Sequence, residues 1–182
     1  MARVLAFLAE GFEDVEALAV IDLLRRARVE TDIVSITDSK EVLSSHKIIM
    51  HADKVFEEAD FENAELIFLP GGGLGTENLY GCEKLKEKIK EYDVAGKKLA
   101  AICAAPSVFG RMGLLEGKKA TCYPGFEDKL LGATPTCERV VVDGNYITSK
   151  GMGTAIDLGL ELIKIMVSEE KSVEIAKQVQ YI

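Results

Sequence analysis

The chain has 182 residues, of which 48% are hydrophobic and 29% charged, with 16 glycines but only 4 prolines. These proportions are those of a globular protein and exclude both a disordered chain and a fibrous repeat. The 22 basic and 30 acidic residues give a net charge of −8, and no segment concentrates basic side chains, so neither nucleic acid nor a membrane is expected as a partner. The length predicts a single domain that spans residues 1–182.

Apolar runs typical of buried strands alternate with helical patterns along the chain. In chain order we predict a strand at 4–9, a helix at 14–27, strands at 31–36 and 65–69, a helix at 83–92, a strand at 98–102, a short helix at 105–112, a hairpin at 140–149 that turns at Asp143 and Gly144, and a helix at 154–167. Such alternation predicts βαβ units, and therefore a flavodoxin-like three-layer αβα sandwich with a mostly parallel sheet. Ligands of such folds bind at the carboxyl ends of the strands, near a topological switch point.

The sequence also predicts where the protein resides and which cofactors it lacks. The apolar run 1–9 ends at Glu10 and lacks the features of a signal peptide, and no apolar stretch reaches the roughly 20 residues of a spanning helix. The four cysteines have no pair at metal-ligand spacing: Cys82, Cys103, Cys122 and Cys137. We therefore expect a cytoplasmic protein with reduced thiols and no cofactor or metal.

Cys103 occupies the junction at which the predicted strand 98–102 turns directly into a helix. Such an elbow exposes a nucleophile only where the flanking residues are small, and Ala101 and Ala105 meet this condition. The start of a helix also favours the thiolate over the thiol. Cysteine is more often buried and inert, but the coincidence of an elbow with small neighbours favours a nucleophile here. The other three cysteines lack this setting, and we interpret them as packing or surface thiols.

A glycine-rich loop follows the predicted strand 65–69 and contains Gly71, Gly72, Gly73 and Gly75. Such a loop can present backbone amides to an anion, although a tight turn would also use glycines. It is not a phosphate loop, because no Gly-Lys-Ser/Thr follows it and its spacing differs from the dinucleotide-binding motif. With Cys103 on the same sheet edge, we predict an oxyanion pocket.

Acidic residues open the predicted helix 14–27. Glu13 and Asp14 fit the ordinary role of solvated acids that complement the helix dipole. Glu16 lies one residue beyond the capping positions, among apolar neighbours. A carboxyl group close to Cys103 in a dry site would share one proton with it and act as a general acid and base. The sequence leaves this role and a solvated acid equally open.

Nucleophilic cysteines usually have a histidine base. This chain has only His46 and His51, which both precede Cys103, and a structural role is favoured for them. A cysteine peptidase or amidotransferase dyad is therefore disfavoured.

Four segments together resemble the DJ-1/ThiJ/PfpI superfamily: EGFEDVE at 10–16, LPGGGLG at 69–75, AAICAAP at 100–106 and TSKGMGT at 148–154. The chain is most similar to the branch of the Parkinson-associated protein deglycase and bacterial YajL. The resemblance implies a flavodoxin-like homodimer in which Cys103 is a readily oxidised thiol hydrogen-bonded to Glu16. It also implies an oxyanion pocket formed by the amides of Gly72 and Ala104, with Gly73 beside them.

Several positions depart from the family pattern. Ala104 replaces a histidine found next to the nucleophile in some members, so a protease would lack its base. Tyr123 replaces a histidine that often precedes the proline after the next strand, and tyrosine donates a hydrogen bond but transfers a proton less easily near pH 7. His46 and Lys150 stand where the branch has an arginine pair near the pocket mouth, and Met152 replaces a common proline. We expect Tyr123, His46 and Lys150 to line the pocket.

Two functions of different classes follow. The first is a cofactor-independent glyoxalase or deglycase that acts on small reactive carbonyls or early glycation adducts, in which Cys103 attacks the aldehyde and Glu16 moves a proton. The alternative is an oxidative-stress sensor or chaperone that acts through oxidation of Cys103. A nucleotide-binding role has neither a phosphate loop nor a tryptophan for stacking to support it.

Overall fold

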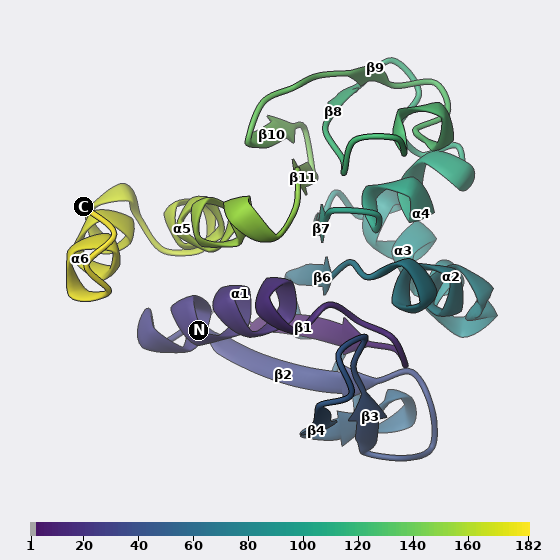
Figure 1. Ribbon diagram of the computed structural model, residues 1–182, viewed down its shortest axis with the longest axis horizontal. Coiled ribbons are helices and arrows are strands. Elements are labelled where there is room, and N and C mark those ends of the chain that lie inside the picture. The colour runs from purple at the N-terminus through teal and green to yellow at the C-terminus, as the bar shows by residue number, and fades with distance from the viewer. Residues whose placement is uncertain (1–2) are drawn as a thin grey trace.

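A computed structural model describes residues 3–182 (Figure 1). Its main sheet contains β1 (Arg3–Leu8), β2 (Glu30–Ser35), β5 (Lys54–Val55), β6 (Leu66–Leu69), β7 (Lys98–Ile102), β10 (Val140–Asp143) and β11 (Tyr146–Ser149). Two further pairs are β3 (Glu41–Leu43) with β4 (Ile49–His51) and β8 (Lys119–Ala120) with β9 (Thr134–Pro135). The helices are α1 (Asp14–Arg26), α2 (Gly73–Gly81), α3 (Glu83–Val94), α4 (Pro106–Arg111), α5 (Ala155–Met166) and α6 (Glu169–Gln178), and the 3-10 turns are η1 (Phe56–Glu58), η2 (Glu127–Lys129) and η3 (Met152–Thr154).

The strand order of the main sheet is β10-β11-β7-β6-β1-β2-β5. Neighbouring strands run parallel except β10 and β11, which form a hairpin. The chain extends from β1 to β2 and β5 on one side, and from β6 to β7 and β11 on the other. The topological switch point therefore lies between β1 and β6. This topology confirms the predicted flavodoxin-like αβα sandwich.

Helices cover both faces of the sheet, with α1, α5 and α6 on one side and α2, α3 and α4 on the other (Figure 1). Alternate residues of β1 point into two apolar clusters. Val4, Ala6 and Leu8 pack with the first set of helices, whereas Leu5 and Phe7 pack with the second. All five are fully buried. Because both faces are covered, the strands are continuously apolar, which is why the sequence identifies them so readily.

The sequence does not predict every element. It misses α2, which begins inside the glycine-rich segment, and α6, as well as the short strand pairs β3–β4 and β8–β9. Strands of two or three residues carry too little periodicity to identify. The β10–β11 hairpin turns at Gly144 and Asn145, one residue later than predicted, because Asp143 pairs with Tyr146. Within residues 3–182, no helix has the length and apolar character needed to cross a membrane.

Candidate active site

The loops that follow β1, β6, β7 and β11 meet at the carboxyl edge of the sheet, beside the switch point. The amide of Gly71 donates a hydrogen bond to Oε2 of Glu16 at 3.0 Å. A Cβ atom placed on Gly71 would lie 2.6 Å from Cβ of Cys103, and one on Gly151 would lie 3.9 Å from Oε1 of Glu16. These loops converge there, and Glu16 and Cys103 lie at the centre.

Cys103 forms a strained turn between β7 and α4. Its backbone φ is 65°, a left-handed conformation that costs a non-glycine residue about 1 to 2 kcal/mol. The Cys103 amide donates to the carbonyl of Ser149 at 2.9 Å, and its own carbonyl accepts from the amide of Tyr123 at 2.8 Å. Ala101 and Ala105 are fully buried beside it. The predicted strand-to-helix elbow is present, and these two hydrogen bonds hold it in place.

Glu16 is a buried carboxyl group in contact with the thiol. Its side chain is almost inaccessible to solvent, and its backbone amide donates to the capping carboxylate of Glu13 at 2.7 Å. Burial raises the pKa of Glu16 to about 7, because an ionised carboxyl loses its hydration there; the hydrogen bonds from Cys103 and Gly71 partly offset this rise. A solvated acid at this position is therefore excluded.

Burial also raises the pKa of Cys103, to about 12. The negative charge of Glu16 acts in the same direction, and the amides of Ala104 and Gly72 oppose it less strongly. Burial and the Glu16 carboxyl group thus oppose the expected effect of the helix start, which favours the thiolate. The helix α4 has only six residues and begins at Pro106, whereas Glu16 contacts the sulfur directly.

The pair of Glu16 and Cys103 has a clear chemical capacity. Two acidic groups in contact do not ionise together readily, so the singly charged pair retains one proton. The Glu16 carboxyl and the Cys103 thiol share this proton, because the two groups are in direct contact. When the sulfur attacks an electrophile, Glu16 can accept the proton. The amides of Gly72 and Ala104, which hydrogen-bond to the sulfur, are the donors available to an oxyanion formed next to it.

The glycine-rich loop makes two close contacts that no side chain could accommodate. A Cβ atom on Gly71 would lie 2.4 Å from Oε2 of Glu16. Gly72 has a φ of 94°, and a Cβ atom on it would lie 2.3 Å from the carbonyl oxygen of Gly11. Gly73, the exposed first residue of α2, has open space around its Cβ position. Close approach of the backbone therefore explains Gly71 and Gly72 but not Gly73.

We expect Gly71→Ala to lower any activity of the Cys103–Glu16 pair by about 10²-fold, since a displacement of about 1 Å in a reacting group has effects of this size. The added methyl group would push Glu16 away from the thiol. Gly73→Ala in the same loop is the matched control and should keep full activity and stability. Turnover and thermal unfolding of the two variants, measured side by side, check this expectation. Equal activity of both variants would contradict it.

A hollow of about 340 Å³ opens next to the pair, lined by Tyr123, Pro124, Arg139, Lys150 and residues 151–154. The half-exposed ring of Tyr123 lies 3.4 Å from the Cβ position of Gly151, which itself borders Glu16. Tyr123 and Lys150 thus lie in the wall of the hollow next to Glu16. This hollow is the natural place for a small substrate.

Arg139 and the polar contacts that shape this wall were not predicted from the sequence. The guanidinium of Arg139 is engaged with the Asp157 carboxylate at 2.6 Å and with the carbonyl of Gly153 at 2.8 Å. The hydroxyl of Thr154 lies 2.7 Å from that of Ser149 and accepts from the amide of Gly151 at 3.1 Å. Only the segment 148–154, singled out for its family resemblance, pointed to this region.

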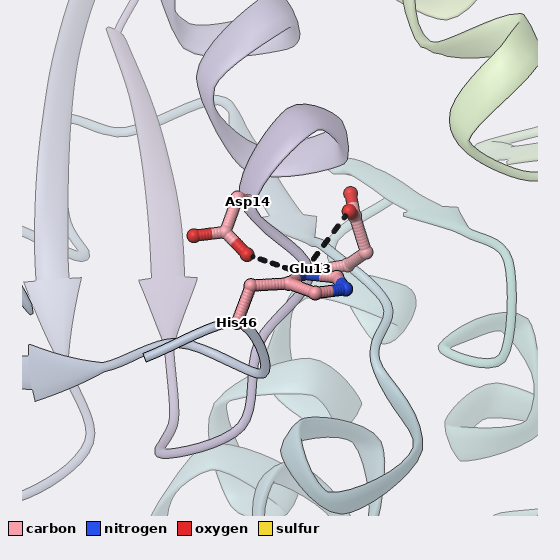
Figure 2. Close-up of side chains that lie close together, drawn as sticks. All are labelled: Glu13, Asp14 and His46. Atoms are coloured by element: carbon pink, nitrogen blue, oxygen red, sulfur yellow. Dashed lines mark hydrogen bonds and ion pairs between the residues drawn. The ribbon is translucent and has the colours of Figure 1, made fainter. Parts of the chain in front are cut away.

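His46 does not lie in the wall of this hollow, contrary to the prediction. It is located in the turn between β3 and β4, where its Nδ1 atom lies 2.8 Å from Oδ2 of Asp14 (Figure 2). Asp14 is 7% exposed, so the expectation of a solvated acid is also wrong there. The physical reason is that the β3–β4 hairpin, which the sequence did not predict, folds against the start of α1.

The sequence profile of the DJ-1/PfpI family matches residues 2–165 of this chain. The chain belongs to this family. Two proteins of Arabidopsis thaliana, the DJ-1 homologs B and A, are 41% and 39% identical over 96% of the chain, which spans only 40% and 45% of their lengths. The Parkinson disease protein 7 homolog of Danio rerio is 30% identical over 95% of this chain and 94% of its own length.

Solved structures of DJ-1/PfpI relatives share the fold over the whole chain. A DJ-1 superfamily protein from Salmonella typhimurium, crystallised as its C103A mutant, has a TM-score of 0.94 and 31% identity, with 99% of this chain and 98% of that chain covered. Oxidized DJ-1 from Toxoplasma gondii has the same TM-score and coverage with 35% identity. These similarities confirm the family resemblance and the fold.

Proposed function

We propose that this protein is a cofactor-independent enzyme that acts on small reactive carbonyl compounds, of the glyoxalase or deglycase type. The observation that carries the proposal is the contact between a buried carboxyl, Glu16, and the thiol of a strained elbow, Cys103. A base with a pKa of about 7 that touches a soft nucleophile suits addition to an aldehyde followed by proton transfer. Membership of the DJ-1/PfpI family supports the same chemistry.

The reaction with methylglyoxal would proceed in balanced steps. The Cys103 sulfur attacks the aldehyde carbon, and Glu16 accepts the proton of the thiol. The amides of Gly72 and Ala104 stabilise the oxyanion that forms. Glu16 then passes the proton to this oxyanion, which gives a thiohemiacetal. Glu16 then removes the hydrogen from this carbon and returns a proton to the neighbouring carbon, which yields a thioester of lactate. Water hydrolyses the thioester and releases lactate and the thiol. The aldehyde carbon is oxidised as its neighbour is reduced, so no external oxidant is needed.

The test is the formation of lactate from methylglyoxal by the purified protein, in ordinary water and in D₂O. We expect steady turnover, with deuterium at the C2 position of lactate because Glu16 exchanges its proton with solvent. Lactate formed no faster than in buffer alone would overturn the proposal. Turnover with early glycation adducts but not with free methylglyoxal would identify the deglycase form of the same chemistry.

A stress sensor or chaperone that responds through oxidation of Cys103 is the second candidate. One specific observation favours it: a structural relative, the DJ-1 of Toxoplasma gondii, was crystallised in an oxidized form. Glu16 could donate a hydrogen bond to a sulfinate on Cys103, because its raised pKa keeps it partly protonated near pH 7. The sensor requires mild peroxide to add two oxygen atoms at Cys103 selectively, which intact-mass and peptide measurements detect. Scattered oxidation of all four cysteines would contradict it.

We also propose that the protein is a homodimer. Val15 and Leu18 lie one turn apart on α1 and are 47% and 46% exposed, and Met152 and Ile156 are exposed near the start of the adjacent α5. Exposed apolar residues on neighbouring elements are typical of an interface. Light scattering should give about twice the 19.8 kDa mass of one chain, and Leu18→Glu should shift the mass toward one chain. A monomeric mass for the unaltered protein would contradict the dimer.

A further inference from the structure

Three metal-ligating side chains converge outside the Cys103 pocket, where the β3–β4 hairpin meets the start of α1. The His46 ring lies between the carboxylates of Glu13 and Asp14 (Figure 2). Its Nδ1 atom is 2.8 Å from Oδ2 of Asp14 and 4.0 Å from Oε1 of Glu13, and one donor atom from each residue lies within 4.8 Å of the other two. Within residues 3–182, no other group of three or more His, Cys, Asp or Glu side chains gathers its donor atoms in this way.

We propose that Glu13, Asp14 and His46 form a binding site for a divalent transition metal ion, for which Zn²⁺ is the test ion. One imidazole nitrogen and two carboxylate oxygens are a donor set that zinc accepts, and the remaining positions would be filled by water. Two carboxylates and a neutral imidazole balance the charge of a divalent cation. The site would differ from the proposed catalytic pair, because neither Glu16 nor Cys103 supplies a ligand.

The spacing of the donors suits a metal ion after only a small adjustment. Ligands about 2.0 to 2.2 Å from zinc in a tetrahedron lie about 3.3 to 3.6 Å from one another. The two distances from His46 Nδ1, 2.8 Å and 4.0 Å, fall on either side of this range. The ring is 68% exposed and can move by the required distance, which is about half an ångström or slightly more. On binding, Nδ1 would give its proton to the other ring nitrogen and use the freed lone pair for the metal.

Surrounding hydrogen bonds hold the three ligands in position, as they do in established metal sites. The second oxygen of Glu13 accepts from the amide of Glu16 at 2.7 Å. The hydroxyl of Ser44 accepts from the amides of His46 and Ile48 at 3.2 and 3.1 Å, which fixes the turn, and it also hydrogen-bonds to Asp14. Both carboxylates are largely buried, so only the histidine would need to be ordered by the metal. A bound ion would tie the β3–β4 hairpin to α1.

The two histidines of the chain provide both the probe and its control. Protein labelled with ¹⁵N-histidine is titrated with ZnCl₂, and the ring nitrogens of His46 and His51 are followed by NMR. We expect the Nδ1 resonance of His46 to shift strongly at one equivalent of zinc, while the resonances of His51, which lies at the end of β4, stay in place. This readout separates the site from binding by cysteine thiols, which would leave both histidines unchanged.

Variants complete the test. His46→Ala removes an exposed side chain, so the variant should keep the fold. Its affinity for zinc, measured by calorimetry, should fall at least tenfold, which is roughly the smallest loss expected when a metal-site residue is removed. Zinc should raise the thermal unfolding temperature of the unaltered protein and of His51→Ala, but not of His46→Ala. Unchanged His46 resonances, or equal zinc affinity of the His46→Ala and His51→Ala variants, would overturn the proposal.

Discussion

Replacement of Cys103 by serine should lower the rate of lactate formation from methylglyoxal by at least about 10³-fold, because the oxygen of serine is a far poorer nucleophile toward the aldehyde. Serine is nearly isosteric with cysteine, so the hydrogen bonds of the elbow to Ser149 and Tyr123 should persist. The variant should therefore unfold at nearly the same temperature as the unaltered protein. Steady-state kinetics and thermal unfolding of the same preparation measure both properties.

The matched control is Cys137→Ser, which changes an exposed thiol away from the elbow. It should keep full activity, since the loss belongs to the site and not to thiols in general. If Cys103→Ser retained normal turnover, the thiohemiacetal mechanism would be wrong. If the unaltered protein showed no turnover but Cys103 still oxidised selectively with peroxide, the sensor would be the better description.

Glu16→Gln should lower the same activity by about 10²- to 10⁴-fold, the range typical of losing a general acid and base. The amide keeps the size of the side chain and can still accept the hydrogen bond from Gly71, but it cannot take the thiol proton. Activity of the unaltered protein should rise as the pH increases through about 7, where Glu16 becomes ionised. This limb of the pH profile should vanish in the variant. A profile that kept its rise near pH 7 would assign it to another group.

The same substitution should have the opposite effect on stability. The pKa of Glu16 is raised from 4.5 to about 7 in the folded protein, so the folded state binds the proton more tightly than the unfolded state does. The associated stabilisation is complete below pH 4.5 and is lost as the pH rises to 7, an effect on the order of 3 kcal/mol. Urea unfolding should thus show Glu16→Gln to be more stable than the unaltered protein at pH 8, with the difference disappearing near pH 4.5. Equal free energies of unfolding at pH 8 would contradict a buried charge at this position.

Both expectations come from one feature, the burial of a carboxyl group beside a thiol. Burial brings the pKa of Glu16 close to neutral pH, where a general base works best. Burial also makes the ionised form of Glu16 unfavourable in the folded protein. The ionised carboxylate that the proposed activity requires therefore lowers the stability of the folded state.

The sequence by itself determined the fold class and the centre of the candidate site. Strands covered on both faces are apolar throughout, so continuous apolar runs in the sequence predicted the positions of β1, β6 and β7. Cys103 was identified because an elbow between a strand and a helix requires small neighbours, and Gly71 and Gly72 because only glycine allows close backbone approach. These requirements concern residues that are neighbours in the chain, so they can be recognised in the sequence.

Only the tertiary structure decided the protonation of the pair and the surroundings of His46. Burial and the contact with Glu16 set the pKa of Cys103, and neither depends on the residues adjacent to Cys103 in the chain. Likewise, His46 contacts Asp14, which lies 32 residues earlier in the sequence, because the β3–β4 hairpin positions it. The three-residue strand β3 is too short to show a periodicity in the sequence. Electrostatic environments and side-chain clusters arise from contacts between distant segments, and such contacts exist only once the chain has folded.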